Sequence, residues 1–275
     1  GFSPCDKAPN RQQTYMVAGR PWTPRNANHS RYGQMVPLSW GLAQSNNWIS
    51  AYLMSKLNPS QFVQLLHDYG INNPDIHASM SLCLGPCEVS VSEMVSAYTA
   101  FANHGIRTAP MFVSRIEDNE GNTIATFQPR MNEVISADNA MKMLTMMMGV
   151  VDNGTAGRLR YRYKLEGQIG AKTGTTNNNS DGWFIAFTPQ LVSGCWVGGE
   201  ERDIHFDSMS MGQGATMALP IWAIFMKKVY ADPSLGYSPT VKFDMPADYN
   251  PCYHAGSGGE QDTFEKVNAI DEVFE

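Results

Sequence analysis

Apolar residues recur three and four positions apart through the first half of the chain, which is the spacing of amphipathic helices. Two helical pieces on either side of a polar turn are predicted within about 37–57, and another helix at 59–69. A capping box predicts a helix over 90–103, and Ser136 is placed to cap a further helix with one apolar face. The first prediction depends on the apolar positions 38, 42, 49, 52 and 53.

The second half of the chain favours extended structure. A hairpin is predicted from 111–117 and 123–127, and two further extended segments cover 165–176 and 181–196. Residues 215–230 then have the apolar spacing of a closing helix. Helices, a hairpin, a helix, three strands and a last helix together indicate an α+β fold, in which an antiparallel sheet is flanked by helices.

The segment from Gly170 to Thr176 reads Gly-Ala-Lys-Thr-Gly-Thr-Thr, and it lies where an apolar run turns polar. On a strand, Lys172 offers a positive charge, and the threonines that follow it offer hydroxyl donors. Gly174 lets another backbone or a ligand come close. A backbone N–H nearby can stabilise an oxyanion. The segment predicts a strand that binds an anion, although an ordinary edge strand with an exposed lysine remains the alternative.

A second polar feature is Ser45-Asn46-Asn47, the predicted turn between the first two helical pieces. A serine and an asparagine presented there can relay a proton and hold a peptide amide. The alternative is that Ser45 only caps the second helix, a position that serine and asparagine favour.

Serine-x-asparagine followed by K-T-G resembles two of the three motifs of penicillin-binding proteins and class A β-lactamases, with Asn46 in place of aspartate. The chain resembles the transpeptidase domain of class A, bifunctional penicillin-binding proteins, in the family's order and over about residues 1–230. This likeness divides the chain into a partial transpeptidase domain (1–231) and an acidic C-terminal extension (232–275). Further similar segments are Ser92–Gly105, Gly149–Ala156, Asp181–Phe184 and Trp196–Gly198.

The resemblance implies a β-lactamase-like transpeptidase fold and a D,D-transpeptidase that cross-links peptidoglycan stem peptides and is acylated by penicillins, without a cofactor or metal. Ser45 would shuttle a proton to the leaving group, Asn47 would hold the substrate amide, and Lys172 would supply positive potential. The substrate-binding residues would be Thr173, Gly174, Thr175 and Thr176. A glycosyltransferase domain and a membrane anchor would precede this region in the parent protein, and the enzyme would act outside the cytoplasmic membrane.

The chain departs from the family at the nucleophile, which lies in an S-x-x-K tetrad where the lysine can act as its base. No such tetrad occurs in the 275 residues, and only Thr263-Phe264-Glu265-Lys266 comes near it. We therefore expect an N-terminally truncated fragment that is inactive by itself. A serine β-lactamase or D-Ala-D-Ala carboxypeptidase is a second reading, and a non-catalytic peptidoglycan-binding module is a third.

The formal net charge of −6 is carried by the end of the chain. Seven acidic residues and one lysine follow residue 244, so residues 1–244 carry no net charge. Nucleic acid is therefore not an expected partner, because no basic stripe is present to meet phosphates. No apolar run is long enough to predict a membrane span within this segment.

The five cysteines are an odd number. Cys83 and Cys87 flank a Leu-Gly-Pro turn that would let them form a disulfide in an oxidising compartment. Cys195 is expected to be a small buried apolar side chain. The six histidines show no metal-binding spacing, so no metal site is predicted.

Overall fold

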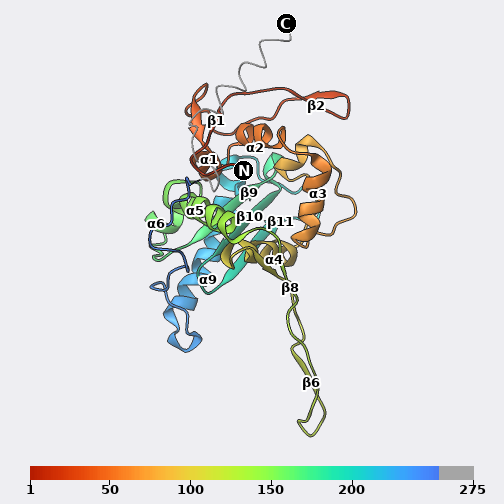
Figure 1. Ribbon diagram of the computed structural model, residues 1–275, viewed down its shortest axis with the longest axis vertical. Helices are drawn as coiled ribbons and strands as arrows, with labels where there is room; N and C mark the ends of the chain where they lie inside the picture. The colour runs from red at the N-terminus through yellow and green to blue at the C-terminus, as the bar shows by residue number, and fades with distance from the viewer. Residues whose placement is uncertain (254–275) are drawn as a thin grey trace.

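The computed structural model describes residues 1–253. It is a mixed fold in which a three-stranded antiparallel sheet, in the order β11-β10-β9, lies among helices (Figure 1). The strands are β9 (Gly170–Thr175), β10 (Asp181–Phe187) and β11 (Val192–Gly198). This confirms the predicted antiparallel sheet flanked by helices.

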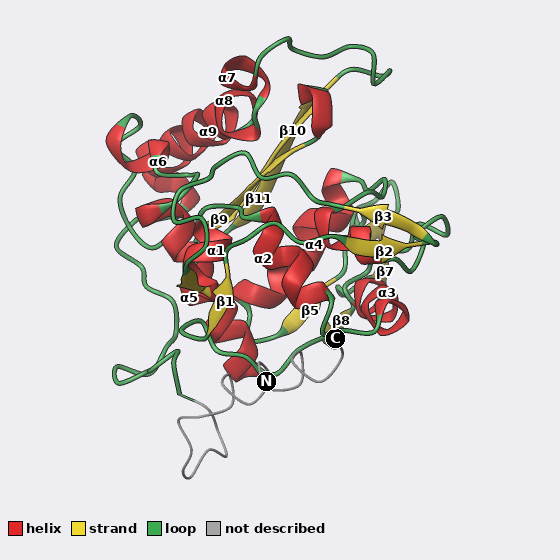
Figure 2. Ribbon diagram, turned by 90° about the horizontal axis from the view of Figure 1, so that it is seen from above, coloured by secondary structure: helices red, strands yellow, loops and turns green. Residues whose placement is uncertain are grey.

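Residues of β10 alternate between the two faces of the sheet, as a strand requires. Phe184 packs against Trp222 of α9 with 5.5 Å between ring centroids. Phe187 instead meets Tyr98 of α4, at 6.4 Å. The sheet is therefore buried between two helical layers, and Figure 2 shows it passing between the α6–α9 group and the remaining helices. The helices are α1 (Leu38–Ala43), α2 (Asn47–Met54), α3 (Pro59–Asp68), α4 (Val91–Ala102), α5 (Ala137–Asn153), α6 (Arg158–Tyr161), α7 (Met209–Gly212), α8 (Gly214–Met217) and α9 (Leu219–Ala231).

Local signals explain where these helices begin. The predicted capping box starts α4, because Ser90 N–H donates to Glu93 Oε2 at 2.8 Å and Glu93 N–H donates to Ser90 Oγ at 3.1 Å. Ser136 caps α5 as predicted. The predicted closing helix is divided into α8 and α9, with Pro220 in the first turn of α9.

The remaining strands form two-stranded pairs. The predicted hairpin is confirmed as β6 with β7, and it continues the β5 and β8 pair into an arm that extends away from the body (Figure 1). These strands are β1 (Lys7–Pro9), β2 (Tyr15–Val17), β3 (Arg20–Trp22), β4 (Met35–Pro37), β5 (Ile106–Thr108), β6 (Arg115–Glu117), β7 (Thr123–Thr126) and β8 (Met131–Glu133). Short 3-10 helices occur at Met80–Leu84, Asn177–Asn179 and Pro233–Leu235.

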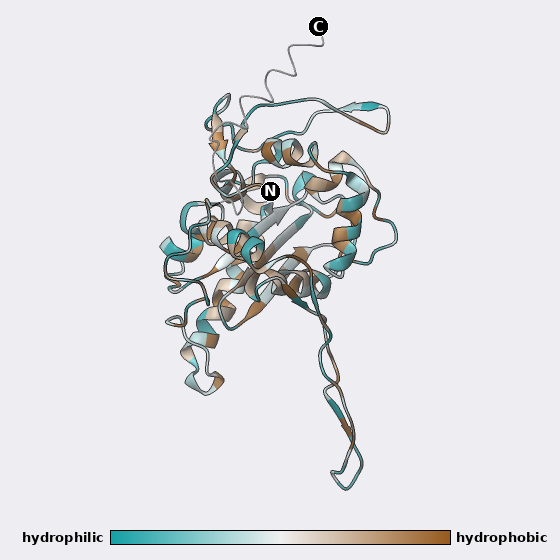
Figure 3. Cartoon of the chain, viewed as in Figure 1, coloured by the Kyte–Doolittle hydropathy of each residue, from teal (hydrophilic) through white to brown (hydrophobic). Residues whose placement is uncertain are grey.

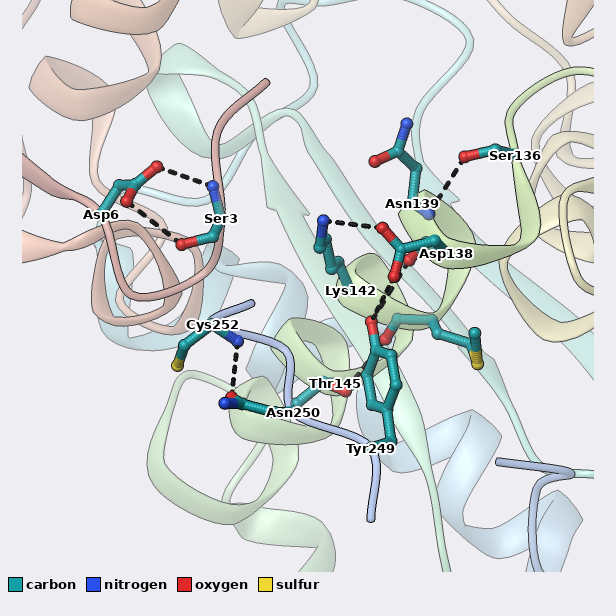
Figure 4. A network of polar contacts seen from close by, with 11 residues as sticks. Ser3, Asp6, Ser136, Asp138, Asn139, Lys142, Thr145, Tyr249, Asn250 and Cys252 are labelled. Carbon is teal, nitrogen blue, oxygen red and sulfur yellow. Dashed lines mark hydrogen bonds and ion pairs between the residues drawn. The ribbon is translucent and has the colours of Figure 1, made fainter. Parts of the chain in front are cut away.

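The segment after α9 returns along the body of the domain. Phe243 is 8% exposed and packs on Phe187. Tyr249 donates to the Asp138 carbonyl at 3.3 Å (Figure 4). Cys252 forms a disulfide with Cys5, with 5.3 Å between their Cα atoms. Residues 254–275 of the predicted acidic extension (232–275) lie outside the described residues.

The possible Cys83–Cys87 disulfide is not present, and both residues are free thiols. Cys87 instead packs against the apolar cluster that contains Leu82, and burial raises the pKa of the Cys83 thiol to about 11. Cys195 packs on the core but is only half-buried, because β11 lies at the edge of the sheet.

Within residues 1–253, no helix has both the length and the apolar character that a membrane span needs.

Candidate active site

Ser45 occupies the turn between α1 and α2, where its side chain is exposed. Its φ of 52° lies in the left-handed region, which non-glycine residues enter uncommonly. The N-cap of α2 is the next residue: the buried Asn46 accepts from Trp48 N–H and Ile49 N–H at 3.0 and 3.1 Å. Asn46 therefore takes the capping role that was the alternative for Ser45, and the serine hydroxyl is left available for the site.

The structure brings Ser45 and Lys172 together across 127 residues of sequence, with 2.7 Å between Lys172 Nζ and Ser45 Oγ. Lys172 Nζ also donates to the Thr173 carbonyl at 2.7 Å. Burial lowers the pKa of the Lys172 ammonium to about 8, because desolvation penalises its charged form. An ammonium can only donate, so Ser45 Oγ accepts this hydrogen bond and its own proton is free to be donated elsewhere.

Thr173 and Thr175 lie one strand repeat apart on β9 but have different partners. Thr173 is 9% exposed, and its Oγ1 is 2.8 Å from Thr155 Oγ1. Thr175 is exposed, and its Oγ1 accepts from Gly214 N–H at 3.0 Å. Both hydroxyls are thus held in place by groups outside the strand.

Strand β9 is an edge of its sheet, so alternate backbone N–H groups point away from β10. Thr176 N–H donates to the Asp181 carbonyl at 3.2 Å. By the alternation of an antiparallel ladder, the N–H of Thr175 points to the open side. The strand therefore presents a backbone donor beside its exposed threonine, and such a donor can stabilise an oxyanion.

Gly174 lies between these threonines, opposite Trp183 in the ladder. A Cβ on Gly174 would come within 3.0 Å of Trp183 Cβ, and a Cβ on Gly214 would overlap the Gly174 carbonyl. Gly214 therefore allows close packing of α8 on the sheet, and Gly174 leaves room for Trp183 on the neighbouring strand. Thr176 belongs to the turn into β10, where its Oγ1 accepts from Asp181 N–H at 2.9 Å.

Asn47, the third predicted catalytic residue, bonds to the N-terminal segment and not to Ser45 or Lys172. Its Nδ2 donates to the Arg25 carbonyl at 2.7 Å, and its backbone N–H donates to Asn26 Oδ1 at 3.0 Å. The N-terminal segment therefore lies against the serine turn and occupies the donor side of the Asn47 amide.

Thr155 has no role predicted from the sequence, although it lies in the family-like segment Gly149–Ala156. Thr155 N–H donates to the Ala43 carbonyl at 3.0 Å, and Gln44 Nε2 donates to the Asn153 carbonyl at 3.0 Å. The end of α5 is thus bonded to both the serine turn and β9. The sequence marks this position only by Gly154-Thr155 after a capped helix, and no local pattern indicates which residues Thr155 contacts.

The described residues contain no group of three or more histidine, cysteine or acidic side chains that could hold a metal. The chemistry that this arrangement supports is anion binding by the β9 donors, together with proton transfer through Ser45. These groups lie at β9, the edge strand of the sheet, to which Ser45 is joined by its hydrogen bond with Lys172.

The comparisons with known proteins agree on one family. The profile of the penicillin binding protein transpeptidase domain matches residues 2–194. Penicillin-binding protein 1A of Aquifex aeolicus is 33% identical over 211 residues, which cover 77% of this chain and 28% of that protein. The chain thus spans little more than a quarter of the length of this relative.

Solved structures show the same fold. The crystal structure of penicillin-binding protein 1A from Haemophilus influenzae superimposes with a TM-score of 0.79 at 22% identity, covering 94% of this chain and 44% of that one. An imipenem acyl-enzyme complex of penicillin-binding protein A from M. tuberculosis gives a TM-score of 0.66 at 20% identity, covering 82% and 56%.

Proposed function

Because the chain belongs to the penicillin-binding protein transpeptidase family, we propose that it forms the part of a D,D-transpeptidase that carries the proton-relay serine and the anion-binding strand. The substrates are peptidoglycan stem peptides, and penicillins are acylating inhibitors. The observation that carries the proposal is the 2.7 Å hydrogen bond from Lys172 Nζ to Ser45 Oγ.

The reaction consists of two acyl transfers. A nucleophilic serine attacks the carbonyl of the penultimate D-alanine, and the peptide bond to the terminal D-alanine breaks. The proton of the nucleophilic serine passes to the lysine of its S-x-x-K tetrad and from there to Ser45, which gives its own proton to the leaving nitrogen. Lys172 stabilises the negative charge that develops on Ser45 Oγ during this exchange. An acceptor amine from a neighbouring strand then attacks the ester, forms the cross-link and releases the serine.

Substrate positioning follows from the remaining donors. Thr173 and Thr175 bind the terminal carboxylate of the acyl donor, and the outward N–H of Thr175 supplies one donor of the oxyanion hole. Asn47 accepts from a substrate N–H through its Oδ1, since its Nδ2 donates to the Arg25 carbonyl. Thr176, which binds Asp181, supports the end of the strand.

The nucleophile is proposed to lie in a segment of the gene product before residue 1. Two facts support this: the sequence has no S-x-x-K tetrad, and the chain covers only 28% of its Aquifex relative. A glycosyltransferase domain and a membrane anchor are proposed for the same upstream region. An extracytoplasmic location is supported by the Cys5–Cys252 disulfide, since disulfides persist in oxidising compartments.

The test is to incubate the full-length gene product with a fluorescent penicillin and, separately, with peptidoglycan strands that carry pentapeptide stems. We expect a covalent adduct that survives denaturation, release of D-alanine and formation of cross-linked dimers. Ser45→Ala should lower the rate of acylation about a hundredfold to ten-thousandfold, the range of general acid–base catalysis. Ser50→Ala is the matched control, because its hydroxyl donates only within its helix, to the Asn46 carbonyl.

Other outcomes would point to the competing functions. Rapid hydrolysis of the penicillin indicates a β-lactamase, and D-alanine release without dimers indicates a carboxypeptidase. Reversible muropeptide binding with no adduct indicates a binding module.

A further inference from the structure

The segment that follows α5 contacts three sides of the candidate active site. Thr155 N–H donates to the Ala43 carbonyl at the end of α1, at 3.0 Å. Thr155 Oγ1 meets Thr173 Oγ1 at 2.8 Å. Arg158 donates to the Ala215 carbonyl at 3.1 Å. Ala215 follows Gly214, whose N–H donates to Thr175 Oγ1. One short segment therefore supports the serine turn, the β9 strand and α8.

The two threonines of β9 differ in how their hydroxyl protons are directed. Thr175 Oγ1 accepts from a backbone N–H, which can only donate, so the proton of Thr175 is free for a ligand. Thr173 pairs with another hydroxyl, and either oxygen can be the donor. If Thr173 donated to Thr155, it would have no proton left for a bound anion.

We propose that Thr155 is a positioning residue, whose hydroxyl donates to Thr173 Oγ1 and so directs the proton of Thr173 toward the carboxylate of the acyl donor. The inference rests on the proposed function, because it concerns how that carboxylate is bound. Both threonines then present donors to one anion. The chain of hydrogen bonds polarises Thr173 and strengthens its bond to the carboxylate.

Removing the Thr155 hydroxyl leaves the Thr173 hydroxyl free to rotate and without a donor to its oxygen. A typical net hydrogen bond corresponds to about a twofold to tenfold change in an equilibrium constant. Thr155→Val keeps the side-chain shape and the backbone N–H to Ala43, so only the hydroxyl is lost. The effect should fall on ligands with a carboxylate and spare ligands without one.

The experiment measures acylation of the full-length gene product by a penicillin and by the methyl ester of the same penicillin. For Thr155→Val we expect acylation by the free acid to be about fivefold to tenfold slower. Most of this change should appear as a higher penicillin concentration needed for half-maximal rate. Acylation by the ester should change less than about twofold. Thr155→Ser should stay within about twofold of the wild type for both. Thr145→Val is the matched control, since its hydroxyl donates to the Met141 carbonyl in its own helix.

A double variant keeps the test informative if Thr155→Val lowers the melting temperature. When Thr173→Val is already present, adding Thr155→Val should change free-acid acylation less than twofold, because the residue through which Thr155 acts is gone. Equal losses for acid and ester, no loss for either, or additive losses in the double variant would overturn the inference alone. A wild type that neither compound acylates would overturn the proposed function as well.

Discussion

The site strand β9 pairs antiparallel with β10, as β6 pairs with β7 in the hairpin, but the surroundings of the two differ. A Cβ added to Gly154, Gly182 or Gly214 around β9 would overlap neighbouring atoms, whereas one added to Gly121 at the hairpin tip meets nothing within 4 Å. The hairpin also exposes apolar side chains, with Ile116 46% and Ile124 66% exposed. In Figure 3 the arm that extends from the body carries a brown, hydrophobic stretch. Packing from several elements therefore holds the site, while the hairpin depends on its own turn.

The turn of the hairpin is organised by one side chain. Asp118 Oδ1 accepts from Glu120 N–H at 2.9 Å and from Asn122 N–H at 2.8 Å. Hydrogen bonds from Asn122 and neighbouring N–H groups lower the pKa of the Asp118 carboxyl. Such a turn forms from local contacts, and for this reason the hairpin was predictable from the sequence.

On the side of strand β9, a large effect should come from removing the Lys172 charge, which joins the strand to the Ser45 turn. Lys172→Ala takes away the donor to Ser45 Oγ, and we expect acylation of the full-length gene product to slow about a hundredfold to a thousandfold. The measurement is the second-order rate constant with a fluorescent penicillin. Lys227→Ala, on the exposed face of α9, should leave this rate unchanged. A Lys172→Ala protein with the wild-type rate would contradict the proposed relay.

Two glycines, Gly149 within α5 and Gly154 just after its last residue, separate packing at the site from helix propensity. Gly154→Ala would place its Cβ against the Ala43 carbonyl, so we expect the free energy of unfolding to fall by about 1–3 kcal/mol, as for overpacked positions. Gly149→Ala has open space and should raise the free energy of unfolding by about 0.5–1 kcal/mol. Urea unfolding of both variants measures the two changes. Equal shifts in the two variants would mean that the end of α5 is not tightly packed on the serine turn.

The pKa of Lys172 predicts opposite pH trends in activity and stability. The ammonium deprotonates as pH rises through about 8, so acylation should decline above that pH with a midpoint near 8. Between about 8 and the unfolded value of 10.5, the unfolded chain binds more protons, so the contribution of this group to stability should increase with pH.

The check is a pH–rate profile alongside unfolding measurements at the same pH values. In Lys172→Arg the side chain stays charged over this pH range, so the midpoint near 8 should disappear from both the rate profile and the stability profile. A wild-type profile without that midpoint would mean that the ammonium does not control acylation.

The smallest effect is expected in the hairpin. Ile124 of β7 is 66% exposed, so Ile124→Thr should change the free energy of unfolding by less than about 0.5 kcal/mol. Leu144 of α5 is 3% exposed, and Leu144→Ala should lower it by about 2–5 kcal/mol. Urea unfolding compares the two, and a large loss for Ile124→Thr would show that the arm is packed in solution.

The sequence by itself determined the elements whose signals are local. The capping box of Ser90 and Glu93, the Ser136 cap and the hairpin turn all act within a few residues, and each appears where it was predicted. The K-T-G strand was also predictable, because apolar runs and turn residues mark the strands on either side of it.

Only the tertiary structure decided which distant groups meet. The hydrogen bond between Lys172 and Ser45, the Thr155–Thr173 pair and the Cys5–Cys252 disulfide join residues 127, 18 and 247 positions apart. A sequence pattern records periodicity and turns, but such contacts depend on how helices pack on both faces of the sheet. For the same reason the disulfide was missed, since the neighbouring Cys83 and Cys87 were the pair that spacing alone favoured.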